Sequence, residues 1–566
     1  MTSQTTKLTV GAFGLLFGAA TFVLTEIGKH GHPNGRVIYI VSILALFVPA
    51  LIWFAKGRYT LSVLAIVAAN FVRWYFELIR FGMFSGVDNY GRFHQFKLLL
   101  QYGHIGFPES NGYPGPNLFI AALQIPFDSF VVPWNAALLC TAVLIPLVVY
   151  LPISSFFGQK LGALATIVVS TDFVYLLNST SLLKENLVLL LFFVLLGLMA
   201  LRSTRSWSDH RYLRQLALIA PIAAVIALTH YTSSYLLLSI LVLLIVAYAL
   251  LRRRNASFDP QFDRFRYLVG ATGVLFGAIV LWANVGADPS FIEWQLDALR
   301  SFGNVALGGE SLIGSANTVG GSDEKTQFLF GSDRFLFIYN WLYRVAMLAG
   351  APLLLWSLFR KRSKNTGIAL AGVAITGLPI VWLVLPILSK LLHATRVARF
   401  SLVFYAPFIA AFLLAALAVA KRGGPSNSRT LHVGLTVLVL TTALVGPSAY
   451  KSSTDYDFRD QPDDSLVPTT GHTELQRHSW ALVTAHTSQR VGGSAPFNEM
   501  ALMTGTVSQY TALPDSNVSL VVVKDESIER GVIIGFDGPL RKPIPFTPPG
   551  RSTVYTNGEY VARYGT

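Results

Sequence analysis

Long apolar segments recur along this chain, and they constrain its fold more than any other feature. Hydrophobic residues make up 53% of the 566 residues and charged residues only 13%, which excludes a solvated or disordered polymer. A helix of roughly 17–25 apolar residues spans the hydrocarbon layer of a bilayer, so we expect about 13 transmembrane helices. Their approximate cores are residues 8–26, 37–55, 60–80, 131–151, 161–178, 186–201, 215–230, 232–251, 267–287, 336–358, 366–389, 398–420 and 430–447.

The charge of the chain is strongly basic, with 44 Lys and Arg against 30 Asp and Glu. In a soluble protein this excess would indicate nucleic acid as a partner. Sorted by loop, however, the excess falls on one side: the loops on the side of the N-terminus carry 20 basic and three acidic residues. Basic loops stay cytoplasmic. We therefore predict a multi-pass cell-membrane protein with a cytoplasmic N-terminus and no nucleic-acid partner.

Two domains are expected, a transmembrane domain over residues 1–447 and an extracytoplasmic domain over residues 448–566. The fold class is an all-α polytopic membrane protein with a small C-terminal α/β domain. In the tail, a β-rich run at 518–523 and a turn at Asn557-Gly558 predict strands, and residues 472–489 predict a helix.

Two small-xxx-small patterns lie within the apolar segments. They are Gly14-Leu-Leu-Phe-Gly18 and Gly273-Val-Leu-Phe-Gly277. Small residues at this spacing let helices approach closely, and we expect close helix packing at both.

Two long loops, 82–116 and 288–335, are predicted on the outer side. The first carries Asp88, Arg92 and His94 within seven residues. A carboxylate there can accept a proton from an attacking hydroxyl or hold a divalent cation, and Arg and His can bind phosphate oxygens. An ordinary solvated loop is the alternative. The second loop is rich in Gly and Ser and is expected to be a part-helical lid.

Two shorter outward turns bring further polar groups to the membrane surface. Lys184 and Glu185 precede one span, where they form either a self-satisfying neighbour pair or part of a site. His230 lies in a turn of hydroxyls and tyrosines and is a candidate substrate-binding residue. Asp172 falls inside a predicted span, and an intramembrane carboxylate is a functional candidate.

A basic cluster lies on the outer side, against the general charge bias. Its members, spaced three residues apart and roughly on one helical face, are Lys390, His393, Arg396 and Arg399. We expect such a concentration of positive charge to bind an anion. Lipid headgroups are one candidate, and the phosphate of a lipid-linked substrate is the other, because Arg makes bidentate phosphate contacts.

Taken together, these segments resemble the GT-C class of integral-membrane glycosyltransferases. The resemblance rests on Gly86-Val-Asp-Asn-Tyr-Gly-Arg-Phe-His94, Tyr113-Pro-Gly-Pro116, Lys184-Glu185-Asn186, the long late loop and the outer C-terminal domain. Within the class the chain is most similar to archaeal and bacterial protein-mannosyltransferase and oligosaccharyltransferase-like enzymes. Two departures are that two spans precede the helix leading to the Asp88 loop, and that the tail has His478-Ser-Trp-Ala481 instead of Trp-Trp-Asp.

The resemblance implies an inverting transferase that uses a polyprenyl- or dolichyl-phosphate-linked sugar outside the cytoplasm. The acceptor is a glycan, a lipid or a protein. Asp88 matches the first-loop acid that serves as general base or metal ligand, and Glu185 matches the acid of the second outer loop. A divalent cation, Mg²⁺ or Mn²⁺, is therefore a candidate cofactor, with Asp88 and Glu185 as its ligands.

The expected mechanism is a direct displacement at the sugar. Asp88 would take the proton of the acceptor hydroxyl, while the basic cluster, together with Arg92, would stabilise the leaving lipid phosphate. A transporter or flippase of lipid-linked sugars is a second hypothesis, but it predicts inverted repeats that the sequence does not display. A glycan polymerase or ligase is a third hypothesis, and a binding or scaffold protein is the fourth.

Overall fold

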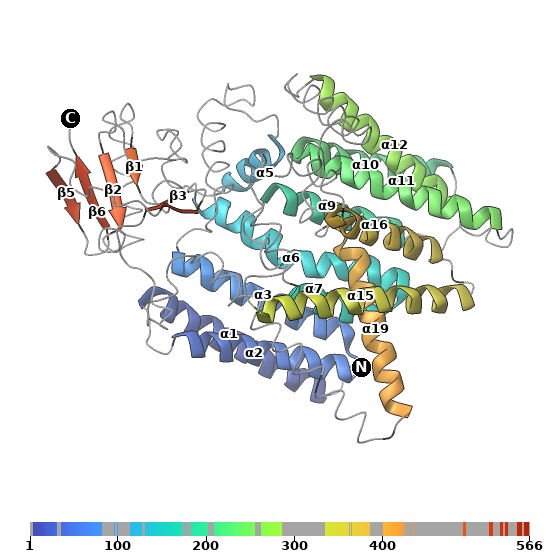
Figure 1. Ribbon diagram of the computed structural model, residues 1–566, viewed down its shortest axis with the longest axis horizontal. Coiled ribbons are helices and arrows are strands. Elements are labelled where there is room, and N and C mark those ends of the chain that lie inside the picture. The colour runs from blue at the N-terminus through green and yellow to red at the C-terminus, as the bar shows by residue number, and fades with distance from the viewer. Residues whose placement is uncertain are drawn as a thin grey trace.

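A computed structural model gives the structure of the chain and describes thirteen helices and six short strands (Figure 1). The helices are α1 (Gln4–His30), α2 (Gly35–Ala55), α3 (Tyr59–Phe81), α5 (Pro114–Gln124), α6 (Val131–Phe157), α7 (Gln159–Thr171), α9 (Leu183–Leu201), α10 (Asp209–Thr229), α11 (Tyr231–Arg254), α12 (Phe262–Val285), α15 (Arg334–Arg360), α16 (Thr366–Val384) and α19 (Leu402–Arg422). Besides these elements, the described residues are 56–58, 96, 99, 125–126, 158, 172, 175, 230, 361, 363, 365, 400–401, 424 and 434.

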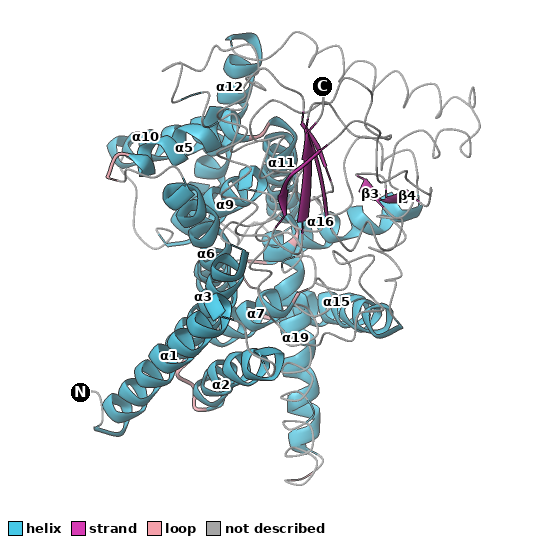
Figure 2. Ribbon diagram, turned by 90° about the vertical axis from the view of Figure 1, so that its left-hand side faces the viewer, coloured by secondary structure: helices cyan, strands magenta, loops and turns pink. Residues whose placement is uncertain are grey.

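Seven of the described helices are long and apolar enough to cross a membrane. These windows are Thr9–Glu26, Tyr59–Phe76, Val132–Phe157, Ser233–Arg253, Phe265–Trp282, Leu342–Arg360 and Leu402–Arg422. The part of the chain that the structure describes is predominantly helical, as in a multi-pass membrane protein (Figure 2).

Twelve of the predicted apolar cores coincide with described helices. The core at 430–447 lies outside the described residues except for Gly434, so the total of 13 spans stays a prediction. The predicted span at 161–178 differs most, since α7 already ends at Thr171. Asp172 has an extended backbone conformation there (φ −71°, ψ 130°) and ends the helix. The length of an apolar segment does not indicate where such a local break falls.

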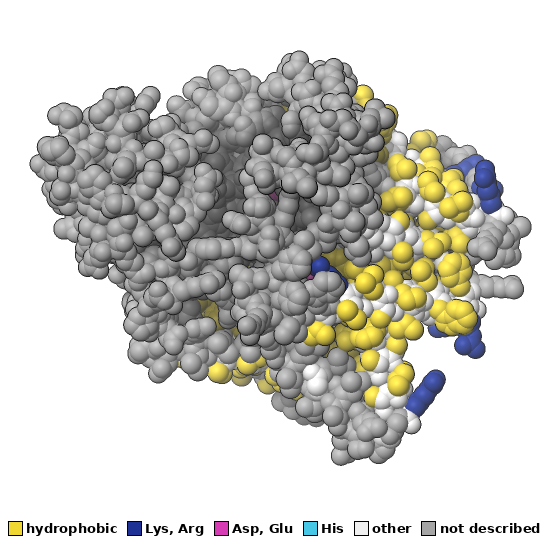
Figure 3. Space-filling view, in the orientation of Figure 1, with side chains coloured by type: hydrophobic (Ala, Val, Ile, Leu, Met, Phe, Trp, Pro, Cys, Tyr) yellow, Lys and Arg dark blue, Asp and Glu magenta, His cyan; other side chains and the backbone are white. Residues whose placement is uncertain are grey.

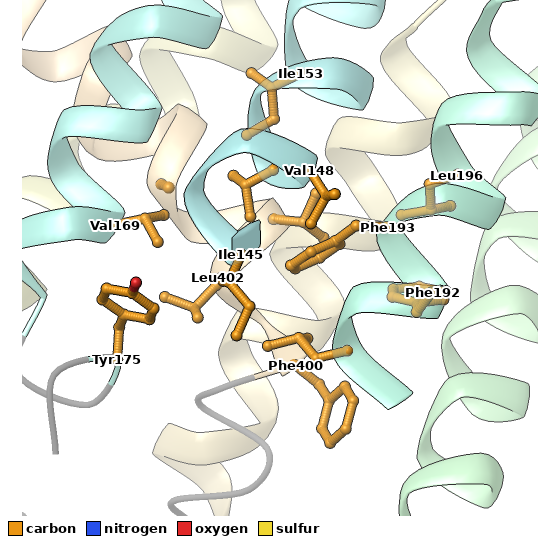
Figure 4. Close-up of a cluster of buried hydrophobic side chains, with 14 of the residues drawn as sticks. Ile145, Val148, Ile153, Val169, Tyr175, Phe192, Phe193, Leu196, Phe400 and Leu402 are labelled. Carbon is orange, nitrogen blue, oxygen red and sulfur yellow. The ribbon is translucent and has the colours of Figure 1, made fainter. Parts of the chain in front are cut away.

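The core of the bundle is built from the apolar faces that the helices turn toward one another. Figure 4 shows Ile145 and Val148 of α6 beside Phe193 of α9, with Leu402 of α19 reaching the same cluster. Phe192, Phe193 and Phe400 are fully buried. In a bilayer such packing supplies dispersion contacts that lipid tails make less well, which holds the helices in one arrangement.

Close helix approach occurs at glycines other than those predicted. A Cβ added to Gly350 of α15 would overlap the backbone carbonyl of Phe408 in α19, so these helices cross in direct backbone contact. By contrast, a Cβ on Gly14, Gly18, Gly273 or Gly277 meets no described atom within 4 Å. Among the described residues, neither sequence pattern lies at a close helix approach, because spacing alone does not say which helix face is covered.

The tail contributes a four-stranded sheet in the order β1-β2-β6-β5. Its strands are β1 (Val491–Gly493), β2 (Leu520–Lys524), β5 (Ser552–Thr556) and β6 (Tyr560–Tyr564), and β3 (Ile533–Gly535) pairs separately with β4 (Gly538–Leu540). β5 and β6 form an antiparallel pair around residues 557–559, where the sequence predicts a turn. The predicted helix at 472–489 lies outside the described residues, so the mixed α/β class of the tail stays a prediction.

Charged side chains of the bundle divide between two ends. The exposed Lys and Arg side chains gather at what we call the basic end, formed by Lys56, Lys160, Arg214, Arg252, Arg253, Arg266, Arg360, Lys361, Lys421 and Arg422. Figure 3 shows Lys and Arg side chains along the right-hand edge of a broad apolar surface. Each lies near the end of its helix, where a charge can stay in water while the apolar surface faces lipid.

Candidate functional site

An acidic residue is buried at the start of α9, at the end of the bundle opposite the basic end. Glu185 lies in the first turn of α9 and has none of its surface exposed. About 16 residues separate it from the end of α9, or about 24 Å along the axis. A carboxylate is favourable near a helix N-terminus because the backbone dipole is positive there. This placement offsets part of the cost of removing the charge from water.

The imidazole of His230 faces this carboxylate. His230 joins α10 to α11, and its Nε2 lies 3.8 Å from Oε1 of Glu185. Only 3% of His230 is exposed. The backbone of His230 keeps its helical hydrogen bonds. Its N–H donates to the carbonyl of Ile226, and its own carbonyl accepts from the N–H of Ser234. Two residues 45 positions apart in sequence are thereby held as one buried acid–base pair.

A serine fixes the orientation of the imidazole. The Nδ1 of His230 and the Oγ of Ser233, three residues along, are 2.6 Å apart. Hydrogen bonding at one ring nitrogen sets which tautomer the other nitrogen presents. Nε2 is thus aimed at Glu185 while Nδ1 is held by Ser233. The pair can share a proton, bind a hydroxyl group, or form an ion pair when the imidazole is protonated.

The first turn of α5 packs against this site. A Cβ added to Gly115 would lie 2.5 Å from Oγ1 of Thr229, the residue that precedes His230, so only glycine allows this approach. Asn117, which follows shortly after in the same turn, is buried, and its Oδ1 has no hydrogen-bond partner among the described residues. The helix α5 begins at Pro114, within the last residues of the predicted loop 82–116. The close approach therefore brings the end of that loop beside the acid–base pair.

Glu185 and His230 offer one oxygen and one nitrogen donor to a cation. The described residues contain no group of three or more His, Cys, Asp or Glu that could hold a metal ion. Two protein donors fall short of the usual three of a catalytic zinc site or the several oxygens of Mg²⁺. The described residues do not by themselves form a metal site.

A second polar cluster surrounds the end of α7, at the same end of the bundle. Asp172, which the sequence marks as an intramembrane carboxylate, is 6% exposed and accepts a hydrogen bond from Tyr175 N–H at 3.0 Å. Tyr405 of α19 is buried close to this carboxylate. One residue earlier, Thr171 bonds to Tyr343 of α15 at 2.8 Å. The tyrosines carry no sequence signal, because tyrosine is common near membrane surfaces for packing reasons.

Helix α3 contributes to this cluster from the other side. Asn70 donates to the Oγ of Ser170 at 3.2 Å. One turn later, Arg73 is fully buried, with its guanidinium 5.7 Å from the centroid of the Trp74 ring. A buried guanidinium inside a membrane bundle is costly and marks a functional region.

The other sequence-predicted site residues are placed as follows. Lys184 lies in the first turn of α9 next to Glu185, and its side chain is outside the described set. Outside the described residues as a whole lie Asp88, Arg92, His94, Lys390, His393, Arg396 and Arg399. The structure therefore brings together Glu185 and His230 and leaves the general base and the basic cluster as predictions.

Comparison with solved structures finds proteins of the class that the sequence resembles. One is ArnT from Cupriavidus metallidurans bound to undecaprenyl phosphate, at 13% identity and a TM-score of 0.47, covering 88% of this chain and 97% of that one. Another is the oligosaccharyltransferase AglB from Archaeoglobus fulgidus in complex with an inhibitory peptide and a dolichol-phosphate. It has 13% identity and a TM-score of 0.47, covering 84% of this chain and 70% of that one.

Both of these proteins are GT-C glycosyltransferases. No protein-family model matches the chain, and no curated protein sequence matches it. At 13% identity the likeness concerns the course of the backbone and assigns no residue. The functional argument therefore rests on the residues of this chain, and above all on the buried pair of Glu185 and His230.

Proposed function

We propose that this chain is a GT-C-type membrane glycosyltransferase. It moves a sugar from a polyprenyl- or dolichyl-phosphate-linked donor to a glycan, lipid or protein acceptor on the extracytoplasmic face, with inversion at the sugar. The observation that carries the proposal is the buried acid–base pair of Glu185 and His230, 3.8 Å apart at the end of the bundle opposite the basic end. A protein that only spans the membrane has no need to bury such a pair.

The charge division of the bundle supports the side on which the reaction occurs. Basic ends tend to stay in the cytoplasm, and on this ground the proposal assigns Glu185 and His230 to the outer side. A lipid-linked donor reaches such a site from within the bilayer, with its phosphate at the depth of the interface. Membrane lipids are expected to surround the bundle, since the described part of the face in Figure 3 is broadly apolar.

In the proposed reaction Asp88 takes the proton of the acceptor hydroxyl as the oxygen attacks the sugar carbon. The bond from that carbon to the lipid phosphate breaks, and the phosphate leaves with its charge stabilised by Lys390, His393, Arg396 and Arg399. The pair of Glu185 and His230 holds sugar or acceptor hydroxyls through charge-assisted hydrogen bonds. Arg92, His94 and Lys184 complete the proposed substrate contacts.

The proposal keeps a divalent cation, Mg²⁺ or Mn²⁺, as a candidate cofactor, with Asp88 and Glu185 as ligands. Binding can be tested apart from activity, by titrating Mn²⁺ into the purified protein and following the loss of its free electron-paramagnetic-resonance signal. The variant Glu185→Gln should weaken that binding. Equal binding by both proteins would remove Glu185 from the ligand set.

The function itself is tested by sugar transfer in proteoliposomes with polyprenyl-phosphate sugar donors and an acceptor mixture. Glu185→Gln and His230→Gln should each reduce transfer by at least tenfold, because each removes one half of the pair. Glu26→Gln is a matched control, since Glu26 is an exposed acid on α1. Movement of the intact donor across the bilayer without release of its phosphate would contradict the proposal and favour a flippase.

A further inference from the structure

The first turn of α5 lies against the two helices that carry the acid–base pair. Helix α5 packs against α9, whose first turn holds Glu185, and against α10, which ends directly before His230 (Figures 1 and 2). Three consecutive residues of its first turn are buried, together with one residue of the next turn: Gly115, Pro116, Asn117 and Ile120. One short helix therefore contacts both helices whose placement decides whether the acid and the base meet.

Gly115 lies directly against the last turn of α10. A Cβ built on it would be 2.5 Å from Oγ1 of Thr229, 2.9 Å from Cα of Thr229 and 3.0 Å from the carbonyl carbon of Leu228. Two of these three atoms belong to the backbone, so no side-chain rotation moves them. The third is held as well, because Oγ1 of Thr229 donates to the carbonyl of Val225. Since carbon atoms pack at about 3.5–4.0 Å, alanine at position 115 would displace the last turn of α10 by roughly half an ångström.

This displacement would be passed on to His230. Thr229 precedes it directly, has no exposed surface, and lies in the turn where the N–H of His230 donates to the carbonyl of Ile226. Because Ser233 holds Nδ1 of the ring, the imidazole moves with its backbone. Its Nε2 is 3.8 Å from Oε1 of Glu185. In a site that orients reacting groups, an error of a fraction of an ångström to 1 Å lowers the rate severely.

We propose that Gly115 is a positioning residue that acts through Thr229 on His230. The absence of a side chain at this position lets α5 and α10 come together so that His230 faces Glu185. The inference rests on the proposed function, in which the pair holds hydroxyl groups of the sugar or the acceptor. Gly115 itself contacts neither substrate.

The test compares Gly115→Ala with Gly162→Ala in the sugar-transfer assay and in thermal unfolding. Gly162 of α7 is a matched control, because a Cβ there would lie 2.9 Å from the backbone N and Cα of Ser154, but two residues from Lys160 at the basic end. Both variants should lower Tm by several degrees through overpacking. Only Gly115→Ala should lower kcat/KM, by about tenfold. An equal loss of kcat/KM in both variants would overturn the proposal, because it would show a general effect of crowding.

A double-mutant cycle with His230→Gln tests whether the effect passes through the imidazole. If it does, Gly115→Ala should lower kcat/KM by at most about twofold more once His230 has been replaced. The combination of Gly162→Ala with His230→Gln serves as the control for folding. A further tenfold loss from Gly115→Ala in the His230→Gln protein would show that Gly115 acts elsewhere.

A second-site change tests the route through Thr229. Thr229→Ala removes Oγ1, the atom nearest to the added methyl group, and leaves the two backbone contacts in place. The protein with both Gly115→Ala and Thr229→Ala should therefore recover about threefold of the kcat/KM that Gly115→Ala alone loses. Absence of any recovery would contradict the route through Thr229.

Failure of the inference can be separated from failure of the proposed function, because the packing of His230 is measurable without sugar transfer. Diethyl pyrocarbonate acylates accessible imidazole nitrogens, and only 3% of His230 is exposed. Its acylation, followed by mass spectrometry, should be about threefold or more faster in Gly115→Ala and little changed in Gly162→Ala, because only the first loosens this turn. If the native protein transfers no sugar, the proposed function fails and the acylation rates decide the inference. If the native protein transfers sugar and Gly115→Ala matches it in both assays, the inference is wrong and the function stands.

Discussion

The buried pair of Glu185 and His230 illustrates how single side chains acquire a chemical role from their surroundings. In water a carboxylate and an imidazole attract one another weakly, but inside an apolar bundle the same attraction is several times stronger. Removing either partner leaves the other buried with less compensation for its lost hydration. Ser233 fixes the orientation of the His230 ring, since the serine hydroxyl and Nδ1 of His230 are 2.6 Å apart. Affinity for a substrate hydroxyl should therefore depend on all three residues.

Because Ser233 orients His230, its loss should lower the rate of sugar transfer even though Ser233 is not proposed to contact the substrate. We expect Ser233→Ala to lower kcat/KM for sugar transfer by about tenfold, the lower end of the effect of removing a group that orients a ligating histidine. Ser239→Ala is the matched control, because Ser239 lies on the same helix, is exposed, and bonds only to the carbonyl of Tyr235. Equal activities of the two variants in steady-state assays would show that Ser233 does not orient His230.

At the scale of elements, the crossing of α15 and α19 depends on the absence of a side chain. Gly350 lies directly against the backbone of Phe408, and the side chain of Phe412 is the next neighbour. Two turns earlier on α15, the hydroxyl of Tyr343 bonds to Thr171 at the end of α7 at 2.8 Å. The crossing at Gly350 and the polar cluster at α7 therefore hold α15 at two points.

Gly350→Ala should destabilise the protein, because its methyl group overlaps a backbone carbonyl that cannot rotate away. Overpacking of this kind costs about 1–3 kcal/mol, so Tm in detergent should fall by several degrees. Gly273→Ala is the control, since its methyl group meets open space and alanine is the better helix former by up to about 1 kcal/mol. A Tm for Gly350→Ala at or above that of Gly273→Ala would contradict the observed crossing.

At the scale of the whole molecule, the basic end and the polar end lie at opposite ends of the same helices. On α19, Tyr405 is about 17 residues from Arg422, or about 26 Å along the axis, which approaches the ~30 Å of hydrocarbon in a bilayer. The exposed Lys and Arg side chains thus lie at one water interface, and the buried Glu185, His230 and Asp172 lie near the other.

Reporter fusions test the orientation that follows from this division. With basic loops in the cytoplasm, alkaline phosphatase fused after residue 566 should be active, and the same reporter in the loop after Lys361 should be inactive. A fluorescent protein that matures only in the cytoplasm should give the reverse pattern. The opposite result at both sites would place Glu185 and His230 on the cytoplasmic side and overturn the proposed use of extracytoplasmic donors.

The sequence by itself determines the class of molecule, because hydropathy, helix length and loop charge act locally along the chain. It also marks Glu185, His230 and Asp172, since charged or titratable groups beside apolar runs are unusual wherever they occur. Only the tertiary structure decides which of them meet. The 3.8 Å between Glu185 and His230 depends on how α9 packs beside the α10–α11 turn, and the bond from Thr171 to Tyr343 joins residues 172 positions apart. The close helix contacts also depend on the tertiary structure. The glycine spacing at Gly14 and Gly273 permits a close helix approach, but among the described helices the close approach occurs at Gly350, because the packing of whole helices decides which face is covered.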